Sequence, residues 1–189
     1  MTLKDTLVPT YHHMLTALSA WLGKAADQLP QGKADALMQA RLAEDMFPLF
    51  TQVCFSCAQA HEGIARLRQE APSPSITALL EKGRNAGTGS ATIAEAQAMI
   101  AETLRIVEAG AADAPDLSPD TAVAHTLPNG MIFDLTAAQY VRDWALPQLY
   151  FHVMAAYAIL RAQGVAIGKV DFVAHMFAFI RPGTMPSPG

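Results

Sequence analysis

The chain has 189 residues, of which 51% are hydrophobic and 16% are charged. That content can fill a single packed core, and it excludes a wholly disordered chain. The formal net charge of −4 leaves no basic field to attract phosphate, so we expect no nucleic-acid partner. The first residues do not form a secretory signal, and no apolar run reaches the roughly 20 residues of a membrane span. We therefore expect a cytoplasmic protein with no membrane partner.

Two helices are predicted in the first third of the chain. Apolar residues recur at intervals of three and four over residues 9–29, and Pro9 suits a first helical turn, where an N–H is not needed. A second helix is expected to begin near Asp45, a capping residue, and to end at Glu70. Residues 76–85 have a weaker pattern, and the glycines of residues 86–90 predict a loop.

The second half of the chain predicts two more helices with a hairpin between them. The third helix spans residues 91–109, with Gly110 as its stop. Two β-prone runs flank Asn129-Gly130, a common two-residue hairpin turn. Thr136 then caps a fourth helix that reaches Gly164 and should kink at Pro147. The fold class predicted is all-α, an antiparallel four-helix bundle with a small β-hairpin between the third and fourth helices.

Two pairs of polar side chains lie one helical turn apart on apolar helices. Cys57 and His61 share one face of the second helix, and Gln148 and His152 share one face of the fourth. If these faces meet, they form a pocket with two imidazoles, a thiol and an amide, to which His12 of the first helix can add a donor. The alternative is that the imidazoles are hydrogen-bonded core residues and that His12 is solvated. Two certain ligands are too few for zinc.

The remaining motifs indicate no further chemistry. Cys54 and Cys57 have CxxC spacing, but they lie in the middle of a helix and are interpreted as small buried hydrophobes rather than a redox pair. The stretch GRNAGTGS is interpreted as a turn, because it lacks the Lys of a phosphate loop and no strand precedes it. Neither G-x-S-x-G nor H-E-x-x-H occurs, and His125 and His175 look incidental.

The segments RLAEDMFPL and LPQLYFHVMAAYAILR carry a resemblance to a bacterial domain-of-unknown-function family within the DinB/YfiT-like superfamily. The resemblance covers residues 1–173 and leaves residues 174–189 as a C-terminal tail. It implies a four-helix bundle, often dimeric, in which many members bind zinc or nickel through three histidines. By that resemblance His61 and His152 match two of the ligands, and Gln148 stands at the third position. Some members of the superfamily use the metal to activate a small thiol.

Three functions follow as hypotheses, and whether the protein is an enzyme stays open. The first is a zinc- or nickel-dependent enzyme of the thiol-transfer type, with His61, His152 and either Cys57 or His12 as ligands. The second is a bundle with a degenerate metal site that binds a small molecule, and the sequence favours it. Its predicted pocket is lined by Cys57, Gln148, His12, Tyr150, Tyr157, Trp144 and the histidines. The third is a dimerising scaffold with no pocket chemistry. Whichever function holds, we expect a homodimer and an apolar tail that packs on the bundle or across a dimer interface and frays after Pro182.

Overall fold

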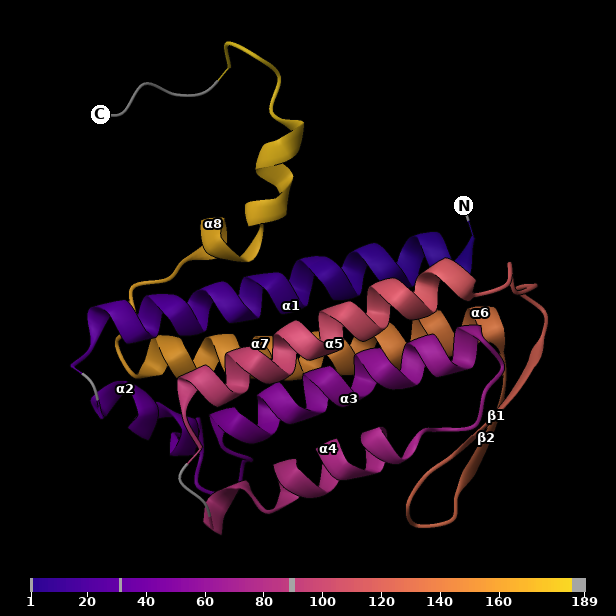
Figure 1. Cartoon of the computed structure of the whole chain (residues 1–189), viewed down its shortest axis with the longest axis horizontal. Helices are drawn as coiled ribbons and strands as arrows, with labels where there is room; N and C mark the ends of the chain where they lie inside the picture. Colours follow the sequence, from indigo (N-terminus) through magenta and orange to yellow (C-terminus); the bar gives the residue numbers. More distant parts are fainter. Residues whose placement is uncertain (1, 31, 89–90, 185–189) are drawn as a thin grey trace.

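The computed structural model describes residues 2–30, 32–88 and 91–184. Four long helices lie side by side in it (Figure 1): α1 (Leu3–Gln28), α3 (Leu49–Leu67), α5 (Ile93–Asp113) and α7 (Leu146–Ala162). Shorter helical segments are α2 (Lys33–Ala36), η1 (Leu37–Gln39), α4 (Pro74–Arg84), η2 (Ala86–Thr88), α6 (Ala137–Gln139), η3 (Tyr140–Ala145), α8 (Lys169–Phe172) and η4 (Ala174–Phe179). The prediction of a mostly helical chain with a small antiparallel hairpin is confirmed.

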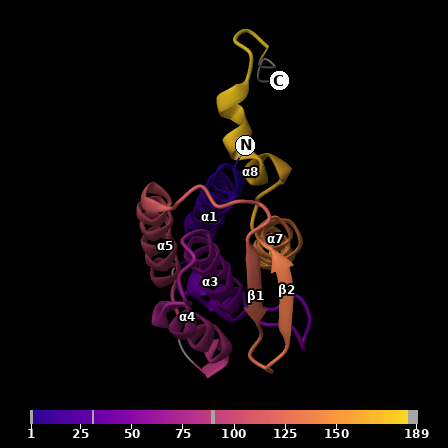
Figure 2. The same ribbon diagram turned by 90° about the vertical axis from the view of Figure 1, so that its right-hand side faces the viewer.

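Helix α3 is the centre of the molecule. It contacts α1, α4, α5 and α7, and the end-on view in Figure 2 shows these helices arranged around it. Its side chains are consequently buried on almost every side, including polar ones such as Thr51, Gln52, Ser56 and His61. Because buried polar groups need partners, the polar residues of α3 decide where this fold can carry chemistry.

Helix α1 begins six residues earlier than the sequence predicts. Thr2 and Asp5 form a capping box, in which each side chain hydrogen-bonds the other residue's backbone N–H. Pro9 therefore lies inside the helix rather than in its first turn. The cap, which the apolar periodicity does not reveal, sets the start of the helix.

Two other predicted helix boundaries are corrected. The second long helix, α3, has Pro48 at its N-cap position, and Asp45 lies outside it. Helix α5 continues past Gly110 to Asp113, because Gly110 serves close packing rather than helix termination: a Cβ there would collide with the side chain of Ile64 on α3.

The weak stretch after Ser73 is the helix α4, which begins at Pro74 and buries Ile76 in the core. Of the predicted glycine-rich loop, residues 89–90 lie outside the described part.

The hairpin pairs β1 (Ala122–Thr126) with β2 (Ile132–Thr136) in antiparallel register, with His125 opposite Phe133. Its turn is longer than the predicted two residues. The Gly130 N–H donates to the Leu127 carbonyl, the Leu127 N–H donates to the Met131 carbonyl, and the positive φ of 86° falls on Gly130 alone. The hairpin thus holds β1 beside α7 and α3 (Figure 2).

Thr136 caps α6, where the fourth helix is predicted to begin, with a capping box to Gln139, and the chain continues through η3 into α7. The predicted disturbance at Pro147 takes the form of a π-helical segment, η3, that ends at Ala145. Proline has no N–H to donate to the turn before it, and the wider π turn accommodates the missing bond. Leu146 accordingly donates its N–H to Val141, five residues back. This segment sets the orientation of Trp144.

The segment after α7 folds back on α1 and then leaves the helices. Phe172 of α8 stacks on Trp21, with ring centroids 5.7 Å apart, and Asp171 pairs with Lys24. The following η4 projects away from the bundle (Figure 1) and exposes apolar side chains, among them Phe179. Of the predicted fraying after Pro182, residues 185–189 lie outside the described part. No helix of the described residues is long and apolar enough to cross a bilayer.

Candidate functional site

A groove of about 700 Å³ lies between α3, α4, the hairpin and α7. Its walls are largely aromatic and aliphatic, and its lining includes Phe47, Phe55, Ile76, Leu80, Leu127, Trp144 and Phe151. The groove is wide enough for a small organic molecule, whose typical sites enclose roughly 300 to 1,000 Å³. Apolar walls with a few polar groups are the usual composition of such sites.

The polar groups gather at the end of the groove next to the hairpin. His125 of β1 is buried, and its Nδ1 lies 3.2 Å from Oε1 of Glu62 on α3. The two are within ion-pair distance, but the approach angle does not make a hydrogen bond, and both ring nitrogens are without a hydrogen-bond partner among the described residues. The His125 ring also contacts the indole of Trp144, with centroids 4.4 Å apart.

Two further polar atoms at this end are shielded from water and have no partner in the described part of the chain. They are Oε1 of Gln59 and Nε1 of Trp144. An unpaired buried polar group is costly, so each such atom in a native fold needs an explanation. A ligand in the groove would supply the partners that the protein does not.

His152 lies in the same groove and is half-buried. Its Nδ1 is 2.9 Å from Oε1 of Gln52 on α3, and its ring sits edge-on to those of Phe55 and Phe151. Burial lowers the pKa of His152 to about 4, because desolvation disfavours the charged imidazolium. The ring is therefore neutral at physiological pH, and Nδ1 donates the hydrogen bond to the amide oxygen.

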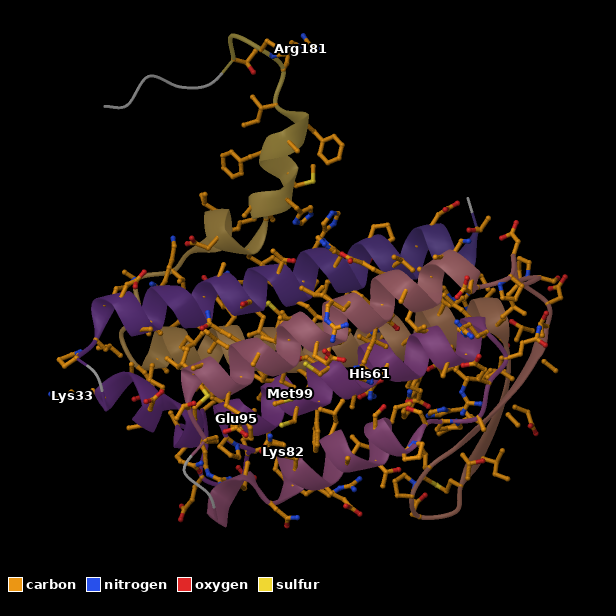
Figure 3. All side chains as sticks on the ribbon, in the orientation of Figure 1. Lys33, His61, Lys82, Glu95, Met99 and Arg181 are labelled. Atoms are coloured by element: carbon orange, nitrogen blue, oxygen red, sulfur yellow. The ribbon has the colours of Figure 1, made fainter. Side chains whose placement is uncertain are left out.

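His61 lies on the opposite side of α3, towards α4 and α5. Its Nδ1 is 3.3 Å from the Ser75 hydroxyl and its Nε2 is 3.2 Å from the Thr103 hydroxyl, so both ring nitrogens are satisfied. Figure 3 shows His61 on the side of Met99 and Lys82, and all three line a separate cavity of about 320 Å³. Burial lowers the pKa of His61, which keeps this ring neutral as well.

The structure does not bring the predicted pair of histidines together. At 100° per residue, positions 52, 59 and 62 of α3 share one side of the helix, and position 61 faces the other way. The faces carrying His61 and His152 therefore do not meet in one pocket, and the two rings line different cavities. Periodicity places each residue on a face of its own helix but does not say which neighbour that face meets.

The other predicted pocket residues are spread over the molecule. His12 is half-exposed and pairs with Glu108 at 3.5 Å. Cys57 is buried on the His61 side, where burial raises the pKa of its thiol to about 12. Tyr157 packs on Trp21, with ring centroids 5.3 Å apart, and Tyr150 is 39% exposed on the outer face of α7. Gln148 is half-buried and does not line the groove. Of the residues predicted to line a pocket, His152 and Trp144 do line the groove.

A zinc or nickel ion of the kind that the resemblance implies does not fit the donors present. An amide stands at position 148, and His61 is on the far side of α3 from His152. Over residues 2–30, 32–88 and 91–184, no three His, Cys, Asp or Glu side chains are grouped closely enough to hold a metal ion. Zinc sites need three or four such ligands.

Sequence interpretation missed the polar end of the groove because its members come from different elements. His125 is on a short strand, Trp144 on a π-helical turn and Glu62 on α3. One signal was present: Gln52, Gln59 and Glu62 form a polar stripe on an otherwise apolar helix, on the side away from His61. A polar stripe on a buried helix indicates a site or a network.

These features define the class of protein: a mostly helical fold with a groove between its long helices and a hairpin. Residues 3–173 match the model of DUF1993, a domain of unknown function, and the chain belongs to this family. The chain is 32% identical in sequence to a DinB family member protein from Shewanella denitrificans, and its fold matches the crystal structure of that protein with a TM-score of 0.68. That match covers 97% of this chain and 96% of the other, which confirms the DinB-like resemblance. No curated protein matches the chain.

Proposed function

We propose that this DinB-like protein binds a small, largely apolar molecule in the groove between α3, α4, the hairpin and α7. The observation that carries the proposal is the groove itself: about 700 Å³ of space with aromatic walls and unpartnered polar atoms at one end. Such a combination is typical of ligand sites, whereas in a purely structural bundle the unpartnered polar atoms would only destabilise the fold.

The competing metal-dependent function has less support. A metal-activated thiol or water requires three or more ligands around an open coordination position. The donors that the resemblance implies are divided between two sides of α3, and the thiol of Cys57 is buried with a pKa raised to about 12. A thiol in that state is a poor nucleophile and a poor metal ligand. Binding without catalysis is the simpler function for this groove.

The test uses anilinonaphthalene sulfonate, a dye whose fluorescence rises in apolar sites. We expect saturable binding to the folded protein. Thr77 is exposed on α4 and lines the groove, so Thr77→Trp should fill the space and weaken dye binding at least about tenfold without loss of fold. Phe179→Ser is the matched control, because it removes a large exposed apolar side chain of η4 and leaves the groove intact.

Two outcomes would overturn the proposal. One is dye binding that Thr77→Trp leaves unchanged. The other is dye binding that disappears in Phe179→Ser, which would assign the dye to the tail. Circular dichroism melting of both variants shows whether each is folded at the temperature of the titration.

A homodimer is a second proposal, and the outer face of α7 favours it. Tyr150 and Met154 are 39% and 43% exposed there, on a helix that is apolar all round. Helices of that composition are normally covered on every side. We expect light scattering to give a dimer and Met154→Lys to give a monomer. A monomeric wild type, or a dimer that Met154→Lys leaves unchanged, would overturn this proposal.

A further inference from the structure

Two hydrogen-bond acceptors lie side by side at the inner end of the groove, near the indole N–H of Trp144 and the ring of His125. Gln59 and Glu62 are three residues apart on α3, so their side chains are neighbours on one helix face, and both line the groove. Oε1 of Gln59 has no partner among the described residues. A pair of adjacent acceptors calls for a donor between them.

The Glu62 carboxylate is held by charge but not by hydrogen bonds. Its side chain is 14% exposed, with Nη2 of Arg66 at 3.6 Å and Nδ1 of His125 at 3.2 Å from Oε1. The Arg66 atom is beyond hydrogen-bond distance, and the His125 contact has the wrong angle. A largely buried carboxylate normally accepts several hydrogen bonds, and neither His125 nor Nη2 of Arg66 makes one to Glu62.

Two arginines lie near the groove, and Arg66, which pairs with Glu62, approaches the carboxylate from outside the groove. Arg66 lines the cavities on the other side of Glu62, around Gly63 and Glu70, and does not line the groove. Arg84, which does, is at the far end of α4, where the Gly83 carbonyl accepts a hydrogen bond from Thr51. From Thr51 to Glu62 the axis of α3 rises by about 16 Å. Among the charged groups that line the groove, the Glu62 carboxylate is therefore at the hairpin end and the Arg84 guanidinium at the opposite end.

The side walls of the hairpin end also suit a cation. The indole of Trp144 and the ring of His125 stand 4.4 Å apart beside Glu62, and Phe55 lies one turn back from Gln59 along α3. Aromatic faces attract organic cations, most strongly when water is excluded. A neutral donor would make a weaker hydrogen bond to the carboxylate than a cation, and an anionic head group would be repelled by it.

We propose that the ligand is an organic amine, an ammonium head group on an apolar or aromatic body. The ammonium ion sits between Glu62 and Gln59 and donates to both, and the body runs along Phe55, Ile76 and Leu80 towards Arg84. This inference rests on the proposed function of the groove and adds the chemical class of the ligand. Glu62 is the residue that selects the charge.

The test compares three probes of equal length: phenylbutylamine, phenylbutanol and phenylbutanoate. Each probe is titrated into the wild-type protein with bound anilinonaphthalene sulfonate, and the loss of dye fluorescence gives its affinity. We expect the amine to compete at least about tenfold better than the alcohol, because a charge-assisted hydrogen bond to a shielded carboxylate is stronger than a neutral one. In Glu62→Gln the preference should fall to about twofold or less. Gln59→Leu should reduce it about threefold and serves if Glu62→Gln does not fold.

Glu102→Gln is the matched control. Glu102 is on α5 and lines the cavity on the His61 side of α3, so the same change of charge there should leave the preference for the amine intact. If the alcohol or the carboxylate competes as well as the amine, the amine class is wrong, while the groove still binds ligands. If none of the three displaces the dye and Thr77→Trp does not affect dye binding, the proposed function fails as well.

Discussion

Both sides of α3 have a buried histidine and polar neighbours, but they differ in whether the histidine nitrogens have hydrogen-bond partners. On the side facing α4 and α5, His61 bridges the hydroxyls of Ser75 and Thr103, and both of its nitrogens have partners. On the side facing the hairpin and α7, Glu62 lies against the buried His125, yet none of the described residues makes a hydrogen bond to the His125 ring. The first side resembles a core, and the second resembles a site.

This difference shows that the presence of a histidine on an apolar helix says little about function. His61 is the more buried of the two histidines that the sequence analysis selected, and its network is complete. A complete network rigidifies a core, whereas unpaired atoms beside a groove mark a place where another molecule can bind. Removing one histidine from each side tests whether the two sides differ in this way.

The largest effect should come from His61→Ala. The variant loses two hydrogen bonds, leaves the Ser75 and Thr103 hydroxyls without the ring, and opens a cavity between three helices. We expect the free energy of unfolding to fall by about 2 to 4 kcal/mol. Urea unfolding followed by circular dichroism measures it, and dye binding to the folded variant should be unchanged.

His152→Ala is the counterpart on the groove side. It removes one hydrogen bond, to Gln52, from a position that is open on one side. We expect it to cost less stability than His61→Ala and to alter dye affinity. If His152→Ala is the more destabilising of the two and His61→Ala is the one that changes dye affinity, the assignment of core and site must be reversed.

A smaller effect is expected from pH, and it also separates the two histidines. The pKa of His152 is about 4 in the folded protein, against an ordinary value of 6.5. Between these pH values the His152 ring is protonated in the unfolded chain and neutral in the folded one. The free energy of unfolding is therefore highest above pH 6.5 and declines as the pH falls towards 4. His61 acts in the same direction.

Replacing His152 with Gln should therefore flatten the pH dependence of unfolding. The slope should decrease by at most about 1.4 kcal/mol per pH unit, the value for one proton. Urea unfolding of both proteins at several pH values between 4 and 7 gives the slopes. Equal slopes in wild type and His152→Gln would contradict the buried, neutral state of this ring.

The smallest effect should be that of metal ions. Since the donors are divided between the two sides of α3, we expect zinc or nickel to leave the melting temperature of wild type, His61→Ala and His152→Ala almost unchanged. Metal analysis of protein purified without a histidine tag is the second readout. Near-stoichiometric metal that is lost in both variants would show that the two rings bind one ion after all.

Sequence reasoning predicts the long helices well and the site poorly, for physical reasons. Strong apolar repeats identify α1, α3, α5 and α7, and Thr136 is a helix cap, as predicted, at the start of α6. Helix α4 has few apolar residues and is missed. The site depends on which faces meet and on a strand histidine, His125, whose neighbours Glu62 and Trp144 are distant in sequence. Local patterns contain no information on such pairings.

The most direct test of the difference between the two sides is the position of a bound ligand. Phenylbutylamine added to isotope-labelled protein should shift the indole N–H resonance of Trp144 and the amides of Gln59, Glu62 and Thr77. The amides of Ala78, Met99 and Thr103, on the His61 side, should stay in place. Shifts confined to the His61 side, or an unperturbed Trp144 at saturating amine, would contradict the account.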